Sequence, residues 1–323
     1  MKAIVVHQHG GPEVLKYEDA EIGKPGPGQA LIDMKAIGVN FVDVYYRKGY
    51  YGDQLPFTPG WEGAGIVESV GEGVSVVKPG DKVAFAGPSS SFAEKSLVQA
   101  DSLIPVPKEV SFEQAAAFPL QGMTAHYLLH EFRKPKMGDV VLIQAAAGGM
   151  GLLLVQWAKH LGAKVFGTVS TPAKAKMAKE AGADEVILYT EKDFAKEAMR
   201  LTNHRGVDLI IDGVGKTTSN GNLEAAAIRG HIVIFGAASG PADPISPNAL
   251  MPRSLSLHGG HLKNFTRTRE ETLARAKDVL EGLQKGWLKF RIDRTLPLSQ
   301  AAEAHRLLEG RETTGKIILI PGG

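Results

Sequence analysis

The sequence contains no cysteine in its 323 residues. This absence excludes disulfide bonds, thiolate metal sites and cysteine nucleophiles. The formal net charge is only +2, which favours neither a nucleic-acid partner nor a membrane surface. No apolar run reaches the roughly 18 residues of a membrane span, and no cationic N-terminal region leads into an apolar core. We therefore expect a cytoplasmic protein without a membrane partner.

The size and the apolar content are sufficient for a globular protein of two domains. Hydrophobic residues make up 43% of the chain and charged residues 22%, a mixture typical of folded globular domains. Short runs separated by Gly and Pro predict strands at 2–7, 29–36, 65–70 and 82–85. The first third of the chain is therefore expected to be an all-β, barrel-like region.

From Asp139 onward, strand-like and helix-like segments alternate. Repeated alternation of this kind predicts a doubly wound parallel sheet covered by helices on both faces. A further strand at 314–320 is expected to return to the N-terminal β region, which makes the parallel-sheet domain an insertion. The alternating segments are strands at 140–143, 164–169, 185–188, 208–211, 231–235 and 255–257, and helices at 149–161, 172–181, 194–201 and 218–228.

A run of small residues lies between the first strand of this region and the helix that follows it. Ala146 stands where the first glycine of the common G-x-G-x-x-G pattern stands, and the helix is expected to stop near Gly162. Small residues let the backbone approach phosphates, and a helix N-terminus offers free N–H groups. The alternative is a tight turn without a ligand. The residues predicted to hold a pyrophosphate are Ala147, Gly148, Gly149, Met150 and Gly151.

The end of the second parallel strand bears on which nicotinamide cofactor is used. NAD-binding proteins usually carry Asp or Glu there to bind the ribose hydroxyls. Here Ser170 follows the strand, Lys174 lies one turn into the next helix, and Tyr189 ends the third strand. A hydroxyl, an ammonium and a phenol suit a 2′-phosphate, so NADPH is expected rather than NADH. The alternative is that Lys174 lies on a solvated helix face and that Tyr189 only packs.

Several motifs along the chain form a recognisable set: the glycine-rich segment from 138 to 159, together with 38–43, 59–65, 71–74 and Gly315-Lys316. This set resembles the quinone oxidoreductase/ζ-crystallin family of the medium-chain dehydrogenase/reductase superfamily, and the resemblance covers essentially the whole chain. It implies a GroES-like catalytic domain (1–124 plus 264–323), an inserted Rossmann NADPH-binding domain (125–263), and an active site in the cleft between them. In that family, the positions matching Ser170, Lys174 and Tyr189 bind the 2′-phosphate.

The chain departs from the zinc-dependent branch of the superfamily. Asn40, Trp61 and Gln121 stand near the positions where those relatives carry cysteine, histidine and cysteine. Glu62 and Asp43 survive, but two carboxylates without an imidazole make a poor zinc site. We expect no metal, and we interpret the scattered histidines as core or surface residues: His126, His130 and His231.

Without a metal to polarise a carbonyl, the resemblance implies delivery of a hydride or single electrons from NADPH to an acceptor that is already electron-poor. The first hypothesis is a quinone reductase. The second is an NADPH-dependent enone, 2-alkenal or enoyl-thioester reductase. The third is a non-enzymatic structural or RNA-binding protein that binds NADPH, as some ζ-crystallins do. The small net charge argues against RNA as the main partner.

Four residues of the N-terminal region are candidates for the catalytic site: Asn40, Asp43, Tyr45 and Tyr51. Asn40 offers a donor and an acceptor, which suits a carboxamide or a substrate carbonyl. The tyrosines suit a flat quinone, or they anchor an exposed loop. The resemblance adds further residues on the cofactor side: Thr124, Gly236, Ala237 and Lys316.

The segment near Gly259 differs from the family pattern and bears on assembly. Related proteins carry an arginine near this glycine, and here His261 is a candidate for a substrate-facing role in its place. The residues from Ser254 to His258 resemble the family's edge strand, which pairs with the same strand of a second copy. The resemblance therefore implies a homodimer.

Overall fold

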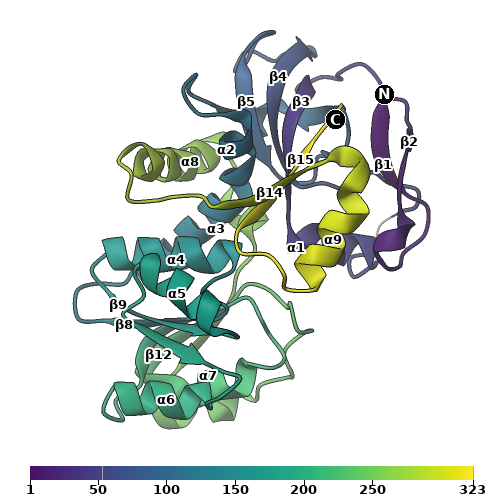
Figure 1. Cartoon of the computed structure of the whole chain (residues 1–323). Coiled ribbons are helices and arrows are strands. Elements are labelled where there is room, and N and C mark those ends of the chain that lie inside the picture. The colour runs from purple at the N-terminus through teal and green to yellow at the C-terminus, as the bar shows by residue number, and fades with distance from the viewer. Residues whose placement is uncertain (53, 323) are drawn as a thin grey trace. The chain divides into compact units, whose positions relative to one another are not determined.

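The computed structural model describes residues 1–52 and 54–322 (Figure 1). The chain forms two compact units. Unit 1 comprises Met1–Met123, Thr266–Lys277 and Phe290–Gly323, and unit 2 comprises Thr124–Phe265 and Asp278–Lys289. The domain limits expected from the sequence stay a prediction.

Unit 1 is built on a seven-stranded sheet with the order β14-β15-β3-β4-β5-β7, in which β6 also pairs with β3. A separate hairpin joins β1 (Lys2–Val6) to β2 (Leu15–Asp19). The strands of the large sheet are β3 (Gln29–Val39), β4 (Glu62–Val70), β5 (Lys82–Ala86), β6 (Lys95–Gln99), β7 (Ile104–Pro105), β14 (Ile292–Pro297) and β15 (Lys316–Ile320).

Strand β3 is long enough to take two partners in succession along one edge. Its first half pairs with β6, from Gln29 to Asp33, and its last residues pair antiparallel with β15, where Ile317 faces Val39. The prediction that the last strand returns to the N-terminal β region is therefore confirmed. Its apolar side chains, such as Ile317, join the buried core of unit 1.

Helices α1, α2 and α9 lie in unit 1, α3 passes from unit 1 into unit 2 at Thr124, and α1 and α9 meet at a buried guanidinium. Arg47 in α1 donates to His305 Nδ1 at 3.1 Å and to Glu309 at 2.8 Å, both in α9. Arginine only donates, so His305 accepts and is neutral; burial and the nearby Arg47 lower its pKa to about 3. The helices are α1 (Phe41–Arg47), α2 (Phe112–Ala117), α3 (Pro119–His130) and α9 (Ala301–Glu309).

Unit 2 contains a six-stranded parallel sheet with the order β10-β9-β8-β11-β12-β13. This order is that of a Rossmann fold, in which the chain starts in the middle and winds outward twice. The predicted doubly wound sheet is therefore confirmed. Its strands are β8 (Val140–Ile143), β9 (Lys164–Val169), β10 (Glu185–Leu188), β11 (Val207–Asp212), β12 (Ala226–Ile234) and β13 (Ser256–Gly259).

Helices cover both faces of this sheet (Figure 1). Helices α4 and α5 lie on one face and α6 and α7 on the other, as right-handed crossovers on either side of β8 require. The bounds are α4 (Gly149–His160), α5 (Pro172–Glu180), α6 (Phe194–Leu201), α7 (Ser219–Ala225) and, across the division between the units, α8 (Arg269–Gln284). The 3₁₀ turns are η1 (Pro12–Val14), η2 (Ala100–Ser102), η3 (Pro247–Ala249), η4 (Met251–Arg253), η5 (Leu262–Phe265) and η6 (Leu298–Gln300).

One helix ends earlier than the sequence pattern predicts. A helix was expected at 218–228, but α7 stops at Ala225 and β12 begins at Ala226. The guanidinium of Arg253 takes the carbonyl oxygens of Leu223, Glu224 and Ala226, which are those left free at a helix C-terminus. The cap comes from a residue distant in the sequence, so local periodicity gave no sign of it.

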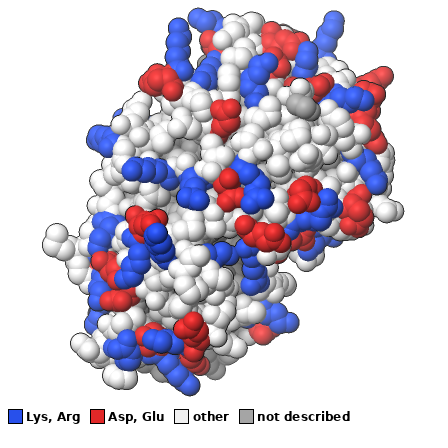
Figure 2. Space-filling view, viewed as in Figure 1, with Lys and Arg blue, Asp and Glu red and all other residues white. Residues whose placement is uncertain are grey.

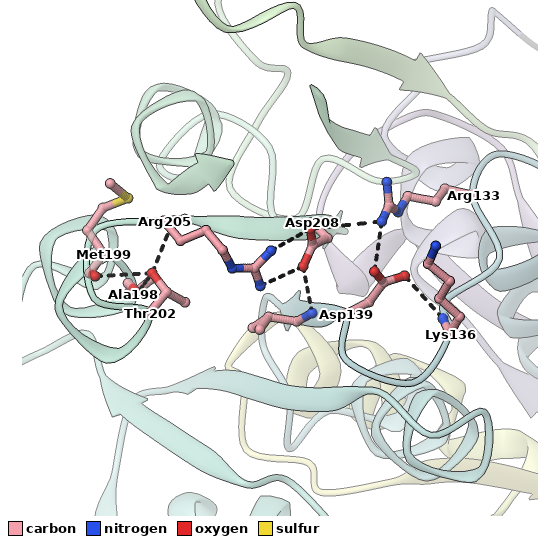
Figure 3. A network of polar contacts seen from close by, with 10 residues as sticks. Arg133, Lys136, Asp139, Ala198, Met199, Thr202, Arg205 and Asp208 are labelled. Carbon is pink, nitrogen blue, oxygen red and sulfur yellow. Dashed lines mark hydrogen bonds and ion pairs between the residues drawn. The ribbon is translucent and has the colours of Figure 1, made fainter. Parts of the chain in front are cut away.

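A charged network holds together the amino ends of β8 and β11 (Figure 3). Arg205 forms two hydrogen bonds of 2.8 Å to Asp208, whose carboxylate accepts the N–H of Val140 at 2.8 Å. Arg133 donates to Asp139 at 2.9 Å. The network therefore fixes the first residues of two neighbouring strands, at the edge opposite to their carboxyl ends.

The surface charge is mixed. Figure 2 shows Lys and Arg interspersed with Asp and Glu on the face that it presents. Within residues 1–52 and 54–322, no helix combines the length and the apolar character that crossing a membrane requires.

Candidate functional site

The glycine-rich segment of unit 2 forms the predicted strand–turn–helix. Strand β8 ends at Ile143, and α4 begins at Gly149 with Gly148 as its N-cap. A Cβ added at Gly151 would overlap the carbonyl oxygen of Ala145, and one added at Gly167 would press on Ala146. Small residues are therefore required where α4 approaches the sheet. Ala147 is buried, and Gly148, Gly149 and Met150 are half-buried at the start of α4.

The turn is strained at one residue. Ala145 has a φ of 53°, in the left-handed region that residues with a Cβ rarely adopt. Its N–H donates to the hydroxyl of Thr168 at 3.2 Å, and its carbonyl oxygen accepts the N–H of Gly148 at 2.9 Å. The N–H of Ala146 donates to the Thr168 carbonyl at 2.9 Å. The end of β9 thus fixes the phosphate turn, which we define as residues 144–149.

The three residues predicted to face a 2′-phosphate lie close together in the chain trace. Val169 pairs with Leu188 in the β9–β10 ladder, so Ser170 and Tyr189 follow neighbouring strand ends. Lys174 lies in the first turn of α5, whose N-cap is Thr171. Lys174 is half-buried, and the Tyr189 side chain is 42% exposed. The structure thus places Ser170 and Tyr189 at neighbouring strand ends and Lys174 at the start of the helix that follows Ser170.

The turn at Gly236 and Ala237 is joined to a second loop that the sequence analysis missed. The N–H of Ala238 donates to Gly213 at 3.1 Å, and the N–H of Ser239 donates to Val214 at 2.8 Å. Asp212, at the end of β11, accepts the N–H groups of Val214 and Gly215. The signal available in the sequence was an aspartate directly after an apolar strand and before a glycine. Thr124 lies elsewhere in unit 2, buried in α3.

Unit 1 contains a buried ion pair that involves two of the predicted site residues. The Lys316 ammonium contacts Glu62 and donates to Asn40 Oδ1 at 2.6 Å. Asn40 Nδ2 donates to Glu62 at 2.9 Å and to the Gly38 carbonyl at 3.2 Å. The remaining Glu62 oxygen accepts the N–H of Leu120 at 2.6 Å. The side chains of Lys316 and Glu62 are 1% and 0% exposed.

This arrangement changes the role expected for Asn40. Both N–H groups of its amide are donated within unit 1, so they do not serve a carboxamide or a substrate carbonyl. Lys316, expected on the cofactor side, binds protein atoms. The same contacts do not fit zinc, because the Glu62 carboxylate already neutralises an ammonium and Trp61 offers no ligand atom. Within residues 1–52 and 54–322, no three His, Asp or Glu side chains form a group that holds a metal.

Asp43 is fully buried beside this ion pair. Its Oδ2 accepts the N–H of Asn40 at 2.8 Å, which fixes the start of α1, and among the described residues its Oδ1 finds no hydrogen-bond partner. Burial raises the pKa of Asp43 to about 8, against the opposing effects of the Asn40 N–H and the Lys316 ammonium. Asp43 is therefore protonated at neutral pH.

The predicted tyrosines form an aromatic cluster, which we define as Phe41, Tyr45, Tyr46, Tyr50, Tyr51 and Trp61. Tyr45 stacks on Tyr50 with ring centres 5.8 Å apart, and Tyr46 lies 4.8 Å from Tyr51 and 5.3 Å from Trp61. Tyr50 and Tyr51 remain 62% and 51% exposed. The rings anchor the segment after α1 and also present an exposed aromatic surface, and their contact with a flat quinone stays a prediction.

The predicted edge strand and His261, which follows it, lie at the β13 end of the parallel sheet. The β13 strand ends the strand order, as expected of an edge. His258 in β13 lies 3.0 Å from His231 in β12, ring nitrogen to ring nitrogen, and burial lowers the pKa of both rings. His261 accepts the N–H of Lys263 at 3.2 Å. The substrate-facing role of His261 stays a prediction.

The buried carboxyl of Asp43 generates a prediction on stability. Its pKa of about 8 in the folded protein exceeds the ordinary value of 3.8, so its favourable contribution is complete at low pH and is lost as the pH rises toward 8. Each pH unit in this window costs the wild type up to about 1.4 kcal/mol of unfolding free energy. Asp43→Asn keeps an acceptor for the Asn40 N–H and removes the titration. Urea unfolding at acidic and alkaline pH should therefore show a flatter pH dependence in this variant.

The control is Asp33→Asn in the same unit, because the Asp33 side chain is 41% exposed. This variant should keep the wild-type slope. Equal slopes for the wild type and Asp43→Asn would contradict the assignment of a protonated carboxyl.

Comparison with known proteins shows which families and relatives the chain is similar to. Residues 26–108 match a family model described as the alcohol dehydrogenase GroES-like domain, and residues 149–278 match one described as a zinc-binding dehydrogenase. The chain is 40% identical over 328 residues to a 2-haloacrylate reductase of Burkholderia, covering 99% of this chain and 98% of the relative. It is also 40% identical over 323 residues to a quinone oxidoreductase of Pseudomonas aeruginosa, covering 99% of each.

A solved structure agrees over the same length. The Escherichia coli quinone oxidoreductase, crystallised in complex with NADPH, superposes with a TM-score of 0.96 at 38% identity, covering 99% of this chain and 100% of the other. Full-length identity at this level, together with the Rossmann strand order and the GroES-like match, determines the family. The chain belongs to the quinone oxidoreductase family of the medium-chain dehydrogenase/reductase superfamily.

Proposed function

We propose that the protein is an oxidoreductase that uses NADPH to reduce quinones. The observation that carries this proposal is the full-length similarity to quinone oxidoreductases, one of them crystallised with NADPH. The second candidate is reduction of an activated carbon–carbon double bond, which the equally similar 2-haloacrylate reductase favours. Both reactions use an acceptor that is already electron-poor, so neither needs a metal to polarise a carbonyl.

The residues of unit 2 fit the cofactor. The residues proposed to hold the pyrophosphate are Ala147, Gly148, Gly149, Met150 and Gly151. Gly149, Met150 and Gly151 offer the first-turn N–H groups of α4, whereas the N–H of Gly148 donates to the Ala145 carbonyl within the turn. Ser170, Lys174 and Tyr189 supply a hydroxyl, a cation and a phenol for the 2′-phosphate. Thr124 and the turn at Gly236 and Ala237 are proposed to hold the nicotinamide end. When bound, NADPH supplies the reducing equivalents.

The residues of unit 1 are proposed to orient the acceptor. Tyr45 and Tyr51 present ring faces and edges that suit a flat acceptor. Lys316 acts through Asn40, because its ammonium fixes the amide, and Asp43 fixes the backbone at Asn40. One lone pair of Asn40 Oδ1 remains for a donor. The proton that completes the reduction comes from solvent or from a tyrosine.

The first prediction of this proposal concerns turnover. The wild type should oxidise NADPH, followed by the loss of nicotinamide absorbance, when p-benzoquinone or phenanthrenequinone is added. NADH should be a poorer donor, and EDTA should have no effect. Activity with a short 2-alkenal or a 2-haloacrylate but with neither quinone would replace the proposal by its second candidate. Absence of turnover with every acceptor would contradict both.

The second prediction concerns cofactor choice. Lys174→Ala should raise the KM for NADPH at least about ten-fold and leave the KM for NADH nearly unchanged, because one charge-assisted contact to a phosphate is lost. Lys176→Ala is the matched control, since Lys176 lies on the same helix with its side chain 79% exposed. Equal effects of the two substitutions would show that Lys174 is only a solvated surface residue.

Assembly and location are the finer parts of the proposal. We propose a homodimer in which β13 pairs with the same strand of a second copy, because β13 ends the sheet order and its Leu257 side chain is 36% exposed. Light scattering should give a molar mass twice that of one chain for the wild type. Leu257→Pro, which disrupts the edge strand, should lower the measured mass to that of a single chain. A wild-type mass of a single chain would contradict the dimer. The cytoplasmic location stays a prediction.

A further inference from the structure

A chain of buried hydrogen bonds crosses the carboxyl edge of the parallel sheet in unit 2. The Thr168 hydroxyl donates to Gln144 Oε1 at 2.6 Å, and Gln144 Nε2 donates to Asn222 Oδ1 at 2.8 Å. Asn222 Nδ2 donates to Asp212 Oδ2 at 2.6 Å, as does the Thr218 hydroxyl. These five side chains are at most 9% exposed. Thr168 comes from β9, Gln144 from the phosphate turn, Asp212 from β11, and Asn222 and Thr218 from α7 and its N-cap.

Every bond in this chain points the same way. Thr168 donates to Gln144, Gln144 to Asn222 and Asn222 to Asp212, whose carboxylate is the last acceptor; Thr218 donates to the same carboxylate as a side branch. Aligned bonds of this kind polarise and strengthen one another in a low-dielectric interior. Asp212 also accepts on its other oxygen, from the N–H groups of Val214 at 2.6 Å and Gly215 at 3.2 Å. One carboxylate thus accepts from the loop after β11 and from helix α7.

The first member of the chain holds the strained residue of the phosphate turn. The N–H of Ala145 donates to the Thr168 hydroxyl, and Ala145 has the left-handed φ of 53°. Such a conformation persists only where surrounding contacts fix it. The last member holds the loop after β11, which bonds to the Gly236–Ala237 turn through the N–H of Ala238. The chain therefore connects the predicted pyrophosphate turn with the predicted nicotinamide turn.

We propose that Thr168, Gln144, Asn222 and Asp212 are positioning residues that set the phosphate turn and the loop after β11 in one cofactor-binding conformation. This inference rests on the proposed use of NADPH. None of the four needs to touch the cofactor, because they act through the backbone at Ala145, Val214 and Gly215. Breaking the chain should weaken NADPH binding without altering the reaction of the bound complex.

The principal test compares two substitutions at Thr168. Thr168→Val keeps the shape and the strand preference but removes the hydroxyl, whereas Thr168→Ser keeps the hydroxyl. We expect Thr168→Val to raise the Kd and KM for NADPH about five- to ten-fold with kcat and the quinone KM nearly unchanged. Thr168→Ser should stay within about two-fold of the wild type. Titration of NADPH fluorescence gives Kd, and steady-state rates give the other constants.

A double substitution that exchanges the amide and the carboxylate tests the hydrogen bond between Asn222 and Asp212. Both oxygens of Asp212 accept hydrogen bonds, one from Val214 and the other from Asn222. In Asp212→Asn, the new NH₂ group therefore faces one of these N–H donors, whichever way the amide is turned. Asn222→Asp alone places two carboxylates against each other. In the double variant D212N/N222D, the amide now on β11 can donate to the carboxylate now on α7, which can still accept from Gln144. We expect each single substitution to weaken NADPH binding and the double variant to restore it.

The control lies at the opposite edge of the same sheet. Asp208→Asn breaks the charged network at the amino ends of β8 and β11 (Figure 3). It should lower the Tm but leave the Kd for NADPH unchanged. The inference is overturned if Thr168→Val binds NADPH like the wild type, or if Asp208→Asn weakens binding as much. Failure of the wild type itself to bind NADPH would instead overturn the proposed function.

Discussion

The buried ion pair between Lys316 and Glu62 is the interaction on which unit 1 depends. A charged side chain at 0 or 1% exposure is tolerated only with a partner and with its other hydrogen bonds satisfied. Here Asn40 and the N–H of Leu120 complete those bonds. The pair therefore connects β15, β4 and Asn40, the residue before α1. A strand from the C-terminal part of the sequence is thus bound to elements from its N-terminal part.

Much of unit 2 could be predicted from the sequence, because its signals are local. An apolar strand, small residues and a helix follow one another within 138–162, and the order of strands and helices fixes a doubly wound sheet. The end of α7 could not be predicted, because Arg253 caps it from 27 residues beyond Ala226. The hydrogen-bond chain from Thr168 to Asp212 could not be predicted for the same reason. Its residues are distant in the sequence, and they become neighbours only when the strands align in the sheet.

The candidate site of unit 1 was predicted in its composition but not in its bonding. Asn40, Asp43 and the tyrosines were named as N-terminal candidates and Lys316 from the resemblance, and Asn40, Asp43 and Lys316 lie together in the structure. Their partners were not predictable, because the bond from Lys316 to Asn40 spans 276 residues of sequence. The amide of Asn40 was expected to serve a ligand, and the structure shows that its donors serve Glu62 and Gly38. Residue type alone does not say which hydrogen bonds are already taken.

The two buried polar systems solve different physical problems. In unit 1, an ammonium, a carboxylate and an amide satisfy one another locally, which leaves little capacity for a ligand and gives a rigid support for the aromatic cluster. In unit 2, the donors run in one direction to a single carboxylate, so a change at either end alters the strength of every bond between. A local cluster can only hold a position, whereas a directed chain ties the conformation of one loop to that of another. The second arrangement suits an edge of the sheet where an extended ligand must be met at several points at once, and the first suits a surface that must accept flat acceptors of varied size.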